Sequence, residues 1–255
     1  MKKLIYTFLL LVMPFAISAQ SFAKAEISKA MGDSAYSKGN YADAVSIYES
    51  VIEKEGYSAD IYYNLGNAYY RNNMIGKAIL NYERALRIDP TDKDTKANLE
   101  FVLTMTKDEV AENYEIFLVT WFKSVVNSLP ITTWAIIAVS TFILLLLALL
   151  LFFFNARAAL RKTALTVAIF SLFVTIFANI AASHIYDYMN DDSEAIVMKE
   201  EAYLKSTPDN SGTELIKVHE GRKVRFVDNS MRDWKEVELE DGTVGWLPAG
   251  ALEQI

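Results

Sequence analysis

The chain has 255 residues, enough for one large domain or two to three small ones, and 52% of them are hydrophobic, a high share for a soluble protein. It has no cysteine and only two histidines, which excludes disulfides and thiolate chemistry and argues against a zinc site. The net charge of −7 arises from two acidic polar regions, 20–112 and 184–255, and acidic surfaces repel nucleic acids.

The first 19 residues have the pattern of a secretory signal peptide. Lys2 and Lys3 precede an apolar run from Leu4 to Phe15, and the small residue Ala19 suits a cleavage site. The alternative is an uncleaved anchor, but the apolar run is short for a membrane span. Residues 1–19 are therefore predicted to be removed, which places the following residues outside the cytoplasm.

Residues 25–58 and 59–92 form an internal repeat with an offset of 34 residues. Small and aromatic residues recur at matching positions, as in the pairs Gly32/Gly66, Ala44/Ala78 and Tyr48/Tyr82. This period and these residue types resemble the tetratricopeptide repeat (TPR), a pair of packed helices. We predict an all-α repeat region over 20–108, with Leu65, Gly66, Ala78 and Tyr82 in its core. Residues 93–108 supply a partial third helix, with Ala97, Leu99 and Phe101 as its packing residues.

The TPR resemblance also implies a groove lined by the first helix of each repeat. The predicted protein-binding residues are Lys29, Asp33, Tyr36, Tyr63, Asn67, Tyr70 and Arg71. Asp94 and Asn98 stand where a carboxylate clamp would need Lys or Arg, so we expect no such clamp. Aromatic and Arg side chains offer rigid contacts and hydrogen-bond donors for a partner segment. The alternative, a solvated polar face, stays open.

Residues 109–131 are predicted to form an amphipathic connecting helix. Its apolar residues recur at helical spacing, for example at Phe117, Trp121 and Val125. Two interpretations remain open. The helix either caps the repeat array or lies flat at a membrane surface before Pro130.

Two uncharged apolar segments, 132–154 and 163–183, are each long enough to cross a membrane as a helix. The loop between them, 155–162, carries Arg157, Arg161 and Lys162, and short cationic loops stay in the cytoplasm. We therefore predict two transmembrane helices with both polar regions on the extracytoplasmic face. Asn179 either hydrogen-bonds to another helix or reaches interfacial water.

The C-terminal region, 195–255, contains short β-rich runs separated by turn signals. The runs cover 195–198, 215–218, 223–227, 234–239 and 243–247. With Trp234 and the pair Gly245–Trp246, this order resembles bacterial SH3 (SH3b) domains, which implies a small all-β barrel. Trp234, Trp246 and Pro248 are the candidate ligand cleft, although Trp246 is also a candidate for the barrel core.

The order of signal peptide, TPR, two spans and SH3b domain resembles the Bacteroides aerotolerance protein family of the BatE type across essentially the whole chain. The resemblance implies a bacterial inner-membrane protein with a role in oxidative-stress tolerance. Its implied partners are other membrane proteins, among them Bat-family proteins with von Willebrand A domains. We expect a scaffold or assembly factor that docks proteins through the TPR groove and the SH3b domain.

A different class of function is a cell-wall sensor whose SH3b domain binds muropeptides. An enzyme is not expected, because the chain has no nucleophile, metalloprotease or phosphate-loop motif. No cofactor is expected either.

Overall fold

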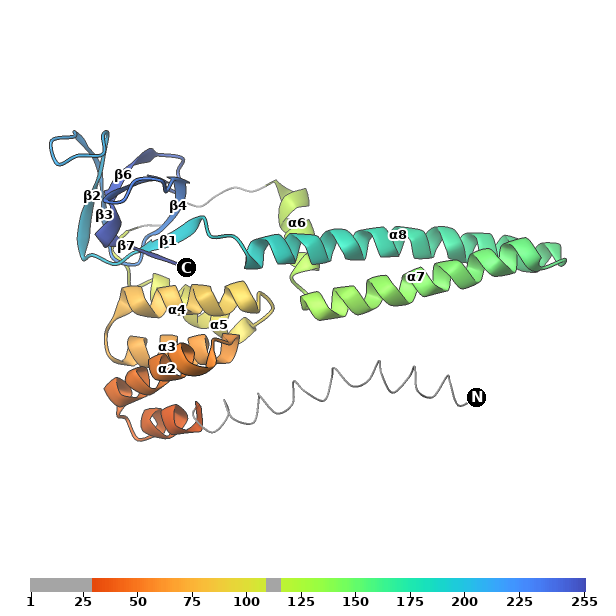
Figure 1. Ribbon diagram of the computed structural model, residues 1–255, viewed down its shortest axis with the longest axis horizontal. Helices are drawn as coiled ribbons and strands as arrows, with labels where there is room; N and C mark the ends of the chain where they lie inside the picture. The colour runs from red at the N-terminus through yellow and green to blue at the C-terminus, as the bar shows by residue number, and fades with distance from the viewer. Residues whose placement is uncertain (1–28, 109–115) are drawn as a thin grey trace. The chain divides into compact units, whose positions relative to one another are not determined.

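The computed structural model describes residues 29–108 and 116–255. The predicted signal peptide, 1–19, lies outside these residues. The chain divides into two compact units: the helical repeats with residues 193–255, and a second unit centred on residues 112–192. Figure 1 labels the helices and strands of both units.

The repeats consist of a helix described over residues 29–37, α2 (Tyr41–Glu55), α3 (Ala59–Arg71), α4 (Ile75–Ile88) and α5 (Lys93–Leu103). Local signals set the boundaries of these helices. The Ser58 side chain accepts a hydrogen bond from the Ile61 backbone N–H at the start of α3. Gly56 ends α2 with a φ of +92°, a conformation that favours glycine.

The TPR positions of the sequence form the core of the repeats, as predicted. Leu65, Gly66, Ala78 and Tyr82 are all buried. A Cβ atom added to Gly66 would lie 2.8 Å from the ring of Tyr82, so only glycine allows this approach of α3 and α4. The first repeat has the same arrangement between its own glycine and tyrosine.

The third helix packs on a different face from the one predicted. In α5 the buried residues are Thr95, Leu99 and Val102, which follow the helical spacing i, i+4, i+7. Leu99 was predicted correctly. The prediction was wrong for Ala97 and Phe101, which are exposed, Phe101 by 53%. Their spacing of two residues from Leu99 places them off the buried stripe.

The C-terminal region forms a seven-stranded antiparallel sheet in the order β3-β2-β6-β5-β4-β1-β7. Its strands are β1 (Glu194–Val197), β2 (Glu201–Lys205), β3 (Glu214–His219), β4 (Lys223–Asp228), β5 (Trp234–Glu238), β6 (Val244–Pro248) and β7 (Leu252–Gln254). The sheet is open, and a closed SH3-like barrel is not confirmed. β2 and β7 were not predicted. Charged neighbours hide the alternating pattern of β2, and β7 is a short strand that pairs with β1.

The sheet packs directly against the repeats, on the side of α4 (Figure 1). The Ile196 side chain of β1 is fully buried within the hydrophobic core of the repeats. Arg87 of α4 donates to Glu194 at 2.7 Å, and Lys223 of β4 bonds to Glu83 at 3.1 Å. Two repeats bury little surface alone. The sheet covers the face that they leave open.

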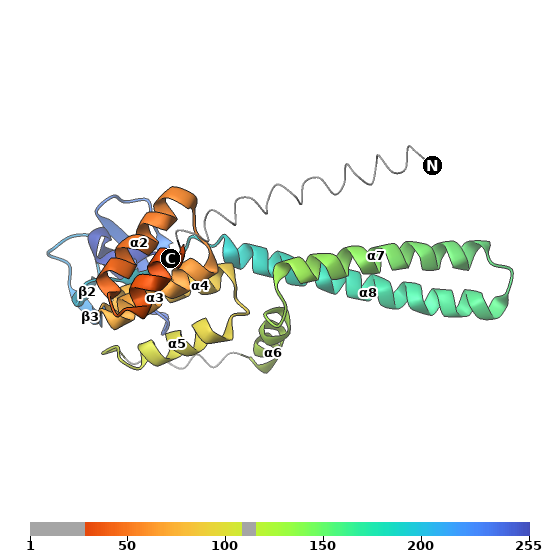
Figure 2. The same ribbon diagram turned by 90° about the horizontal axis from the view of Figure 1, so that it is seen from below.

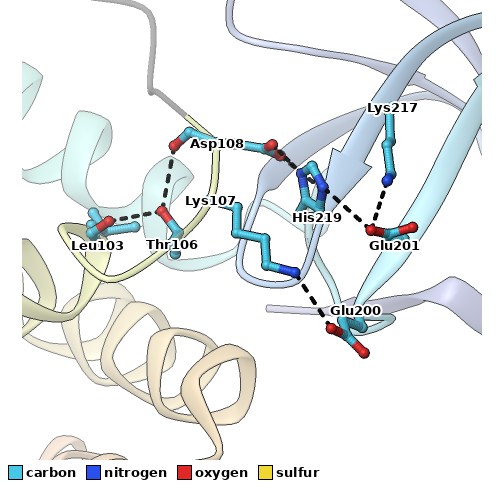
Figure 3. A network of polar contacts seen from close by, with 8 residues as sticks. All are labelled: Leu103, Thr106, Lys107, Asp108, Glu200, Glu201, Lys217 and His219. Carbon is cyan, nitrogen blue, oxygen red and sulfur yellow. Dashed lines mark hydrogen bonds and ion pairs between the residues drawn. The ribbon is translucent and has the colours of Figure 1, made fainter.

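A turn between β3 and β4 completes this contact. The Glu220 carboxylate accepts from the Gly76 backbone N–H at 2.9 Å, which satisfies a free donor at the start of α4. Asp108, just beyond α5, accepts from the His219 backbone N–H at 2.8 Å and lies 2.5 Å from its Nδ1 (Figure 3). Lys107 pairs with Glu200 at 3.4 Å beside it.

The second unit contains α6 (Phe117–Val126), α7 (Ile131–Phe154) and α8 (Ala158–Met189). By length and composition, α7 and α8 are able to cross a membrane. They lie side by side in antiparallel directions (Figure 2), and alanines such as Ala138, Ala168 and Ala178 are buried between them. The Thr141 and Thr175 hydroxyls are 2.8 Å apart. Asn179 is exposed, and its amide donates to the Thr175 carbonyl oxygen of its own helix.

The amphipathic helix α6 belongs to the hairpin unit. Val126 is fully buried, and its carbonyl oxygen accepts from the Trp134 indole N–H at 2.9 Å. The Phe122 ring packs edge-on against Phe177 of α8. The outer face of α6, including Phe117 and Trp121, is exposed. Of the segment predicted to be this helix, residues 109–115 lie outside the described part.

Candidate functional site

The first helix of each repeat presents the predicted groove residues. Tyr63, Asn67 and Tyr70 are spaced by three and four residues, so they share one face of α3, and Arg71 lies at its edge. The helix over 29–37, the first of the preceding repeat, contributes the three other candidates: Lys29, Asp33 and Tyr36. All of these side chains are at least partly exposed, and Arg71 is exposed. Lys29 makes an exposed ion pair with Asp60 at 3.8 Å.

Two of the candidates are used by the fold itself. The Asp33 carboxylate accepts from the Tyr48 hydroxyl at 2.6 Å and from the Asn64 side-chain amide at 3.1 Å. One repeat later, the Asn67 amide oxygen accepts from the corresponding donors, Tyr82 and Asn98, at 2.7 and 2.9 Å. The two sets of three residues correspond one to one, and each pair is 34 residues apart in the sequence: Asp33 with Asn67, Tyr48 with Tyr82, and Asn64 with Asn98. The same hydrogen bonds therefore recur with the 34-residue period, as the core positions do, and together they form a ladder along the repeats.

This ladder connects neighbouring repeats, because Asn64 on α3 and Asn98 on α5 each belong to the first helix of the repeat that follows. Sequence reasoning missed Asn64 and Asn98 as partners of the groove residues. Their 34-residue separation, shared with the pair Asp33 and Asn67, was the signal that could have revealed them. Asn98, which stands where a carboxylate clamp needs a cation, instead donates to Asn67 and to the Tyr63 hydroxyl.

Aromatic rings and one cation form the more accessible part of the face. The Arg71 guanidinium lies 4.5 Å from the centre of the Tyr41 ring, and Tyr41 packs edge-on against Tyr36 at 5.2 Å. Tyr70 packs edge-on against the exposed Phe101 at 5.9 Å. Cation–π contacts of this kind are weak at exposed sites. The Arg71 side chain also hydrogen-bonds to Tyr36, but a guanidinium has five N–H donors, so this bond does not use all of them.

A pocket of about 280 Å³ opens between these helices. Its lining consists of Asp33, Tyr36, Ser37, Tyr48, Asn64 and Asn67. Burial raises the pKa of Tyr36, while the charge of Arg71 acts in the opposite direction. Burial and the hydrogen bond to Asp33 raise the pKa of Tyr48 as well. Both hydroxyls thus stay protonated at neutral pH. The Tyr48 hydroxyl donates to Asp33, which leaves Tyr36 as the tyrosine of this pocket that is suited to noncovalent recognition.

The sheet places its three candidate residues together. Trp234 pairs with Pro248 across β5 and β6, and Trp246 pairs with Glu236, so all three candidates share one face. They are partly exposed, whereas Val237 and Leu247 on the other face are fully buried. Trp246 is therefore not the core residue that one interpretation of the sequence expected.

Comparison with known proteins identifies the repeats. A family model described as tetratricopeptide repeat matches residues 59–92, and one described as TPR repeat matches residues 32–73. No curated protein matches the chain. Among residues 29–108 and 116–255, no group of three or more His, Asp or Glu side chains is arranged to hold a metal ion. The TPR repeats support a role as a protein–protein interaction scaffold and indicate protein partners in general.

Proposed function

We propose that this chain is a non-catalytic, membrane-anchored docking protein of the bacterial envelope, which recruits a protein partner through the groove, the concave face formed by the first helix of each TPR repeat. The observation that carries the proposal is that some residues of that face are used by the fold and others are not. The fold uses the polar atoms of Asp33 and Asn67, whereas Tyr36, Tyr70 and Arg71 remain accessible. Tyr and Arg are enriched among the residues that dominate binding energy at interfaces.

The contact between the repeats and the sheet supports the membrane topology that the charge pattern predicts. Because Ile196 of β1 is buried in the core of the repeats, both must lie on the same side of any membrane. The intervening chain then crosses an even number of times, which fits two spans at α7 and α8. The cationic loop over 155–162 favours a cytoplasmic turn, with repeats and sheet outside the inner membrane.

This topology makes a direct prediction. Protease added to intact spheroplasts is expected to degrade the repeats and the sheet, and to spare a tag inserted in the loop at 155–162. Permeabilised spheroplasts, in which the tag is also cleaved, and an intact cytoplasmic marker protein serve as controls. Protection of the repeats or of the sheet in intact spheroplasts would overturn the proposed orientation.

The resemblance to the BatE family supports a more specific partner. On that basis, the repeats dock a Bat-type membrane protein with a von Willebrand A domain, in a complex for aerotolerance. Crosslinking in native membranes, followed by purification and identification of the captured proteins, tests this assignment. If no such protein is recovered, the assignment to a Bat-type complex is wrong. The docking function itself is tested separately.

Docking through the concave face is tested by the double substitution Tyr70→Ala and Arg71→Ala in the full-length chain. We expect crosslinked partner recovery to fall at least about tenfold, because aromatic and Arg anchors commonly contribute about 2 kcal/mol or more. The fold should persist, because the ladder at Asn67 and the buried core are untouched.

The matched control is Lys54→Ala with Tyr57→Ala, which removes an exposed cation and an exposed aromatic ring outside the groove. This control should retain the partner, and both variants should melt near the wild-type temperature. A folded Tyr70/Arg71 variant that keeps every partner would exclude the concave face as the docking site.

The exposed face of the sheet favours a second candidate function. Trp234, Trp246 and Pro248 lie together there, and partly exposed indole rings suit stacking against a cell-wall peptide or sugar. In this alternative the protein senses muropeptides. Purified muropeptides added to the full-length chain would then quench tryptophan fluorescence saturably, and a flat titration would exclude it.

A further inference from the structure

A second pocket, of about 270 Å³, lies on another face of the repeats. It is bounded by α2, α3, α4 and β7. The groove residues Tyr63, Asn67 and Tyr70 occupy one side of α3, whereas Tyr62 and Tyr69 of this pocket lie about a third of a turn from the middle of that side. The volume is below the roughly 300–1,000 Å³ of pockets for drug-sized ligands, so it suits one side chain.

Carboxylates line one wall of the pocket, and aromatic rings line another. Glu49 and Glu53 are four residues apart on α2, and Tyr62 and Tyr69 are seven apart on α3, so each pair shares a helix face. The Tyr69 hydroxyl donates to Glu49. Glu53 is exposed and makes no ion pair or hydrogen bond with any residue in the described part of the chain.

The two cations of the pocket already have contacts of their own. Arg84 of α4 bonds to Glu253 at 3.2 Å and to the Gln254 carbonyl oxygen at 2.6 Å. The Arg84 guanidinium also lies 5.9 Å from the centre of the Tyr62 ring, and the Lys77 ammonium lies 5.1 Å from the centre of the Tyr69 ring. The charge of Arg84 offsets that of Glu253, but neither Arg84 nor Lys77 forms an ion pair with Glu53. The mouth of the pocket therefore keeps a free negative charge.

Asn81 supplies a polar group to the same pocket. Its side chain is only 3% exposed and its amide donates to the Lys77 carbonyl oxygen at 2.8 Å. Its amide oxygen, however, has no donor among residues 29–108 and 116–255. A buried acceptor without a donor is unfavourable, and native structures satisfy nearly all of them. An occupant with several N–H groups would supply the missing donor.

We propose that this pocket receives a single basic side chain, Arg or Lys, from a partner protein. The cationic head would lie beside the Glu53 carboxylate, where charge-assisted hydrogen bonds favour it. Its N–H groups would face Asn81. The site is separate from the concave face, so the result of its test does not depend on the docking function proposed above.

The test is a titration of the full-length chain in detergent micelles, followed by NMR of the methyl groups of Ile52, Leu65 and Leu80, which line the pocket. The probes are N-acetyl-arginine amide and N-acetyl-lysine amide, and the neutral control is N-acetyl-citrulline amide. We expect saturable shifts with at least one basic probe and none with citrulline. Absence of saturation with both basic probes, or equal shifts with citrulline, would overturn the proposal.

Variants assign the site. Glu53→Gln should weaken binding of the basic probe roughly fivefold or more, because one charge-assisted contact is lost. Glu55→Gln removes the same charge two residues away, outside the pocket lining, and should leave binding unchanged. Asn81→Leu should weaken binding while the melting temperature of the unligated protein stays equal or rises. Unchanged binding in Glu53→Gln would refute the pocket as the site.

Discussion

Replacement of Gly66 by leucine is expected to destabilise the repeats strongly. A Cβ alone would lie 2.8 Å from the Tyr82 ring, and three further carbon atoms have no space to enter. Tyr82 has little freedom to move away, because it is buried and its hydroxyl donates to Asn67. Overpacking of a core costs about 1–3 kcal/mol and sometimes more. We expect a loss of about 3 kcal/mol or more, since leucine adds a whole side chain.

The measurement is thermal unfolding of the full-length protein in detergent, followed by circular dichroism. The melting temperature should fall by roughly 10 °C. The matched control is Gly250→Leu, because a Cβ at Gly250 meets no atom within 4 Å and the residue is exposed. An unchanged melting temperature for Gly66→Leu would mean that α3 and α4 do not pack in the observed register.

Replacement of Arg87 by methionine is expected to loosen the sheet from the repeats. The Arg87 side chain is 8% exposed, and it donates to Glu194 at 2.7 Å and to the Ile255 carbonyl oxygen at 3.2 Å. Methionine fills much of the same space, but it leaves the partly buried Glu194 carboxylate, 22% exposed, to the Lys223 ammonium at 3.0 Å. Removal of one partner of a buried ion pair costs about 3–5 kcal/mol.

We expect a value near 3 kcal/mol for Arg87→Met, because Lys223 retains part of the compensation. Urea unfolding of the full-length protein measures the change, and hydrogen exchange should show faster exchange in β1 and β7. The control is Arg84→Met, one turn away, whose ion pair with Glu253 is more exposed and contributes about 1 kcal/mol or less. Equal stability of Arg87→Met and wild type would show that this ion pair does not hold the sheet.

Much of the repeat structure was predictable because it depends on local spacing. The 34-residue period placed Gly66, Ala78 and Tyr82 in the core, and those positions are buried. Apolar segments at 132–154 and 163–183 likewise correspond to the long helices α7 and α8. In both cases, a periodic pattern within one helix or helix pair decides the burial, so neighbouring residues carry the information.

The candidate site was predictable only in part. Helical spacing put Tyr63, Asn67 and Tyr70 on one face of α3, but it did not show that Asn67 accepts hydrogen bonds from Tyr82 and Asn98. That role depends on which helices lie next to each other in space. The exposure of Trp246 is a similar case, because the pairing of β5 with β6 decides which face of the sheet is buried.

The sequence by itself therefore determined the repeats, their core and the two long apolar helices. Only the tertiary structure decided that the sheet completes the repeat core. Ile196 is more than 100 residues from α4 along the chain, yet it is buried in the core of the repeats, and Glu220 bonds to the start of α4. No local pattern records such a contact, because the polar and apolar groups that satisfy each other meet only after the chain has folded back on itself.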